Sequence, residues 1–263
     1  MITETLVSII LVSVMIIMLA TLIPFGIGLI RTSKGNITAV FLVFYYTLIL
    51  FVLLFWLIYD IMLPDARMPF AANEIGEFTM FFIQAAIVNS LFESRPESKL
   101  LLVGSIFFTA VNVVLWWSWS GEWIQDIITG VAFAWVMYCI ARALWGTRTL
   151  SKRAWVTISV MALMCVLCQA LTFFVGETAG AVLETVGYGF VSAGIVFFAL
   201  QIYRTAVKEK SSRGFLILVV ALTIWIIMGE YMSAGVWYNS FMGLRVATTP
   251  LWFVAARRVV REA

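Results

Sequence analysis

The sequence contains no histidine. This absence excludes bis-histidine haem ligation, histidine-based zinc sites and Ser-His-Asp catalytic triads. The three cysteines, Cys139, Cys165 and Cys168, are too few for a four-cysteine metal cluster. No lysine lies inside an apolar stretch, which excludes a retinal Schiff base. We therefore expect no metal site, no cofactor and no catalytic residue.

Charged residues are also scarce. They make up 12% of the chain, against about 25% in ordinary soluble domains. Hydrophobic residues make up 63%, and a soluble fold of 263 residues could not hide that much apolar surface. The composition predicts a lipid bilayer as the main partner. Residues 1–263 are expected to form a single transmembrane domain without a soluble domain.

The apolar residues are gathered into nine stretches. Each is long enough, or nearly so, for the roughly 20 helical residues that cross a 30 Å hydrocarbon core. The sequence thus predicts an all-α polytopic bundle of about nine transmembrane helices, arranged as one leading helix followed by four hairpins. The stretches are 5–30, 37–63, 76–92, 100–119, 122–145, 154–175, 179–207, 214–233 and 240–256.

The charges are sorted between the two sides of this bundle. In the predicted arrangement, 15 of the 17 basic residues fall on one side, and 10 of the 14 acidic residues fall on the other. Lys and Arg are retained in the cytoplasm during membrane insertion. The N-terminus is therefore predicted outside and the C-terminus in the cytoplasm, in the plasma or cytoplasmic membrane. Charges sorted in this way do not indicate nucleic-acid binding.

Among the ionisable residues of the spans, four in the outer halves stand out: Asp126, Glu184, Glu230 and Arg245. Ionisable groups at membrane depth are costly and tend to face a protein interior or an aqueous cavity. Arg245 needs a carboxylate partner, and Glu184 and Glu230 are nearest to it in depth. One interpretation is an outward-facing polar site. The other is a structural ion pair that joins the last hairpins.

Other polar residues lie deeper in the spans. Gln84 and Asn89 belong to stretch 76–92, and such side chains commonly form hydrogen bonds between helices. The small residues of stretch 179–207, among them Gly187 and Gly194, predict that this helix is central. Pro250 lies one turn beyond Arg245 and favours a kink there.

Tryptophans lie near the predicted membrane boundaries. Trp145 and Trp155 fall at the cytoplasmic boundary, where amphipathic rings favour the headgroup level. We interpret both residues as membrane anchors.

Two functional hypotheses follow. The first is a transporter or channel for a small solute or ion, with Gln84, Asn89, Asp126, Glu184, Glu230 and Arg245 as candidate binding residues. Its mixture of acids with one base favours a cationic or zwitterionic solute. The second is a membrane receptor, sensor or accessory subunit that works with partner proteins. An intramembrane enzyme is a third class, but no catalytic pair is visible.

Overall fold

The computed structural model describes residues 2–58, 72–92, 122–172 and 174–262, with the backbone alone at 2–4, 72–75, 77–78 and 122–131. Most of these residues are helical, and no strand occurs among them. They form eight α-helices, and a short π-helix, η2 (Thr205–Glu209), follows α7. The α-helices are α1 (Ile2–Thr32), α2 (Ile37–Trp56), α3 (Ala72–Ser90), α5 (Glu122–Gly146), α6 (Lys152–Thr172), α7 (Glu177–Arg204), α8 (Ser212–Met232) and α9 (Gly235–Glu262).

The helices coincide with eight of the nine predicted stretches, and the ninth, 100–119, lies outside the described residues. The all-α prediction is therefore confirmed for the described part of the chain. Five helices there are long and apolar enough to cross a membrane: 5–32, 37–56, 152–172, 177–209 and 212–232. This composition is that of a membrane protein.

The predicted end of the last stretch, at residue 256, was too early. Helix α9 continues to Glu262 and carries Arg257, Arg258 and Arg261. Neither glycine nor proline follows Pro250, and arginine is a good helix former, so nothing in the sequence ends the helix sooner.

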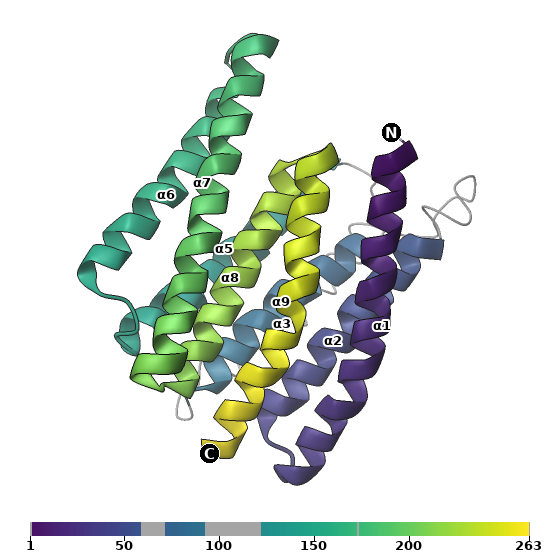
Figure 1. The fold of residues 1–263 in the computed structure, drawn as a ribbon, viewed down its shortest axis with the longest axis vertical. Coiled ribbons are helices and arrows are strands. Elements are labelled where there is room, and N and C mark those ends of the chain that lie inside the picture. Colours follow the sequence, from purple (N-terminus) through teal and green to yellow (C-terminus); the bar gives the residue numbers. More distant parts are fainter. Residues whose placement is uncertain (1, 59–71, 93–121, 173, 263) are drawn as a thin grey trace. The chain divides into compact units, whose positions relative to one another are not determined.

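The chain divides into two compact units. Unit 1 contains residues 1–11 and 144–255, and unit 2 contains residues 12–143 and 256–263. In unit 1, α6 and α7 run side by side as an antiparallel hairpin, and α8 packs beside α7 (Figure 1). In unit 2, α2 packs against α3.

Helix α8 is the most buried of the membrane-length helices described, with 83% of its apolar window buried against 39% for α7. Every residue from Gly214 to Ile227 is buried. The prediction that stretch 179–207 is the central helix was therefore wrong. Small residues allow close approach on one face only, and Val182, Val196 and Leu200 leave other faces of α7 exposed.

Two buried tryptophans of α8 and α9 donate hydrogen bonds within unit 1. Trp225 Nε1 donates to the carbonyl oxygen of Val191 on α7 at 2.7 Å. Trp252 Nε1 of α9 donates to Thr223 Oγ1 of α8 at 2.8 Å. A buried indole N–H requires an acceptor. These two bonds therefore join α8 to α7 and α9 to α8, in addition to the apolar packing between the helices.

Three basic residues adopt left-handed backbone conformations where helices end, and Lys210, with φ 53°, is the one after η2. Lys34 follows α1 with φ 54°, and Arg148 follows α5 with φ 52°. Gly35 N donates to Ile30 O at 2.9 Å, and Thr149 N donates to Leu144 O at 3.2 Å. These are the six-to-one bonds of Schellman caps. In such caps the residue with the left-handed conformation is usually glycine.

Candidate functional site

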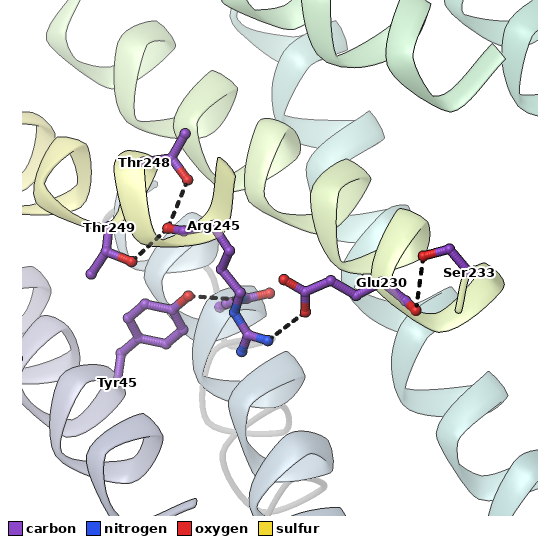
Figure 2. Close-up of polar contacts among 7 residues, drawn as sticks. Tyr45, Glu230, Ser233, Arg245, Thr248 and Thr249 are labelled. Atoms are coloured by element: carbon purple, nitrogen blue, oxygen red, sulfur yellow. Dashed lines mark hydrogen bonds and ion pairs between the residues drawn. The ribbon is translucent and has the colours of Figure 1, made fainter. Parts of the chain in front are cut away.

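The main polar site is the ion pair between Arg245 and Glu230 in unit 1. Arg245 Nη1 lies 2.7 Å from Glu230 Oε2, and the two side chains are 14% and 9% exposed. Glu230 lies two residues before the end of α8, and Arg245 lies ten residues into α9. Helical side chains lean toward the N-terminus, so the arginine reaches back along α9 to the carboxylate (Figure 2). The carboxylate partner that Arg245 was predicted to need is thus Glu230.

The backbone on both sides of this pair is held by hydroxyl groups. Thr248 Oγ1 and Thr249 Oγ1 donate to the carbonyl oxygen of Arg245 at 3.1 and 2.8 Å (Figure 2). Pro250 follows, and it has no N–H to continue the helical bonding. On α8, Ser233 donates to the carbonyl oxygen of Glu230 through its backbone N at 3.3 Å and its hydroxyl at 3.5 Å. These bonds hold the backbone of Glu230 and Arg245 in place, and with it the starting points of the two charged side chains.

The other predicted ionisable residues are placed differently. Glu184 is on α7 and is exposed, so it is not the residue that pairs with Arg245. Asp126 belongs to α5, and its side chain lies outside the described residues. An exposed carboxylate on a membrane-length helix keeps its contact with water or headgroups, because burial without a partner is costly.

The two predicted amides form hydrogen bonds between helices of unit 2. Gln84 Nε2 of α3 donates to the hydroxyl of Tyr45 on α2 at 3.2 Å, and Gln84 is fully buried. Asn89 Nδ2 donates to Cys139 Sγ on α5 at 3.4 Å. Among the described residues, Gln84 Oε1 accepts no hydrogen bond. These contacts give both residues the helix-joining role that is the common one for membrane amides.

Sequence reasoning missed three residues that form hydrogen bonds between helices: Tyr45, Ser8 and Asn239. Tyr45 accepts the bond from Gln84, and Ser8 Oγ donates to Asn239 Oδ1 at 2.7 Å, which joins the start of α1 to α9. A tyrosine inside an apolar run is a signal for the first contact, because its hydroxyl needs a partner. No sequence signal pairs Ser8 with Asn239, which are 231 positions apart.

Comparisons of the chain with protein-family models, with curated proteins and with solved structures found no match.

Proposed function

We propose that this protein is a polytopic protein of the cytoplasmic membrane with nine transmembrane helices, its N-terminus outside and its C-terminus in the cytoplasm. Five helices of sufficient length and hydropathy support the membrane assignment. In unit 1, the connections at 147–151 and 205–211 carry Arg148, Lys208 and Lys210, whereas Glu177 begins α7 at the opposite end of the hairpin. This sorting supports the orientation.

We further propose that the protein moves a small solute or ion across the membrane. The observation that carries this proposal is the Arg245–Glu230 pair, two charges that are almost wholly buried beside Pro250. Charges at membrane depth are costly, a buried ion pair adds little net stability, and in membrane proteins such charges commonly belong to substrate or ion pathways. Glu230 would meet the positive end of a cationic or zwitterionic solute, and Arg245 would meet a negative end.

The test is flux into proteoliposomes that contain the purified full-length protein. Alkali cations, small amines and zwitterionic amino acids are supplied separately as probes. The wild type is expected to move at least one class, and Glu230→Gln is expected to lose most of that flux. Glu184→Gln is the matched control, because it removes an exposed carboxylate of the same unit. Equal flux in wild type and Glu230→Gln, or no flux of any probe, would remove the transport proposal.

A receptor or accessory subunit is the second proposal, and the packing of α8 supports it. Fourteen consecutive residues, Gly214 to Ile227, are buried, and the indoles of Trp225 and Trp252 bond across to neighbouring elements. A rigid, closely packed helix of this kind suits a scaffold better than a moving gate. A protein that moves none of the probes, and that purifies in fixed stoichiometry with another membrane protein, would favour this role.

A further inference from the structure

A groove lies on the surface of unit 1 where α5 is followed by α6. Its volume is about 400 Å³. The rings of Trp145 and Trp155 lie with their centroids 5.9 Å apart and tilted by 58°. Trp145 is 69% exposed. The lining residues are Trp145, Trp155, Val156, Ser159, Val160 and Leu163.

The turn beside the groove is firmly built. The Schellman cap at Arg148 closes α5, and Ser151 Oγ accepts from Ala154 N at 3.2 Å at the start of α6. Between them, the hydroxyls of Thr147 and Thr149 are 2.6 Å apart, and Leu150 is buried. Four local contacts therefore hold this short connection in one conformation.

Three exposed basic residues, Arg148, Lys152 and Arg153, belong to this turn and the start of α6. Arg148 is three positions after Trp145, and Lys152 is three positions before Trp155. The helical period places Lys152 in one row with Val156 and Val160. A positively charged end thus adjoins an apolar groove that has two indole rings at its border.

We propose that this groove binds one anionic phospholipid, with an acyl chain against Val156, Val160 and Leu163 and the phosphate at Arg148 and Lys152. Basic pockets at the ends of membrane helices bind anionic headgroups, and indole rings favour the same depth. The outer face of α6 continues beyond the groove as exposed Val166 and Leu171, and α6 has the length and hydropathy of a membrane span. The groove therefore opens toward hydrocarbon, where a lipid chain is the available occupant.

This inference goes beyond the proposed function, because a lipid site does not require transport. It uses the proposed orientation only to assign the lipid to the cytoplasmic leaflet. A failure of the flux experiment would leave it untouched, and its own failure would leave transport untouched.

The test is native mass spectrometry of the full-length protein, titrated in detergent with phosphatidylglycerol and with phosphatidylcholine of the same acyl chains. The wild type is expected to retain one phosphatidylglycerol selectively. Arg148→Gln and Lys152→Gln should each weaken its binding by about fivefold, the effect of one basic residue at a membrane surface. Lys208→Gln is the charge control, because Lys208 is exposed on η2 and not on α5, α6 or the turn that joins them.

A second pair of variants separates the groove from general electrostatic attraction. Ser159→Phe fills the groove without changing a charge and should abolish selective retention. Val166→Phe adds the same bulk to a residue that is 62% exposed on α6 but outside the groove, and it should bind like wild type. Equal retention of both lipids by the wild type, or full retention by a folded Ser159→Phe protein, would overturn the proposal.

Discussion

The ring of Trp225 on α8 occupies the space that a side chain on Gly194 of α7 would need. Its indole nitrogen donates to the carbonyl oxygen of Val191, one turn earlier on the same helix, at 2.7 Å. The ring also contacts Phe198, with centroids 5.8 Å apart. One missing Cβ therefore allows both the aromatic packing and the hydrogen bond between α7 and α8.

Gly194→Ala should destabilise the protein. The added methyl group displaces the Trp225 ring, which costs about 1–3 kcal/mol by overpacking and about 1 kcal/mol more if the hydrogen bond is lost. Gly189→Ala is the control, because a Cβ there has no neighbour within 4 Å. Alanine is the better helix former, so this control should be neutral or slightly stabilising. Thermal unfolding in detergent measures both, and equal melting temperatures would contradict the close approach.

Removing one member of the Arg245–Glu230 pair should be more harmful than removing both. Arg245→Ala or Glu230→Gln alone leaves the partner mismatched in a buried site, a loss of about 3–5 kcal/mol for a fully buried charge. The double variant should recover part of that loss. A double-mutant cycle on the free energy of unfolding gives the coupling. Glu184→Gln, at an exposed position, should leave stability unchanged. Additive single effects would show that the pair is not coupled.

Arg148→Gly should raise stability. A residue other than glycine with φ near 52° has a conformational cost of roughly 1–2 kcal/mol, which glycine avoids. Glycine is also more flexible when unfolded, so we expect a net gain of about 1 kcal/mol. Arg148→Ala separates the side chain from the backbone, because alanine keeps the strain and should bring no gain.

Gly35→Ala should lower stability. Gly35 has φ 84° in the Schellman cap after α1, a conformation that alanine adopts only at a cost. If Arg148→Gly is no more stable than wild type in detergent melting, the arginine side chain itself supplies a compensating interaction.

Single cysteines can test the proposed orientation in intact cells. Cysteines at Lys152 and Lys208 should resist a membrane-impermeant thiol reagent, and one at Glu177 should react. All three positions are exposed, and they avoid the positive φ values of Arg148 and Lys210. The native Cys139, Cys165 and Cys168 are buried, so background labelling should be low. Labelling at Lys152 and Lys208 with protection at Glu177 would show that the true orientation is the reverse of the proposed one.

The type and approximate place of each described helix could be predicted from the sequence because they depend on local properties, although exact ends such as that of α9 could not. Hydropathy over about 20 residues defines a membrane-length helix wherever it packs. Ser211 also acts locally, because its side chain accepts a hydrogen bond from Gly214 N at the start of α8. The need of Arg245 for a carboxylate also follows from one residue and its depth, because an unpaired charge there is costly.

Tertiary structure alone decided which partner each residue has. Glu184 and Glu230 are similar in depth along the sequence, and only the packing of α8 against α9 brings Glu230 to Arg245 while Glu184 stays exposed. In the same way, α8 rather than the glycine-rich α7 is the more buried helix. The sequence of a uniformly apolar helix does not show which of its faces will be covered. Its burial depends on the helices that surround it. Those neighbours come from distant parts of the chain, so no local pattern specifies them.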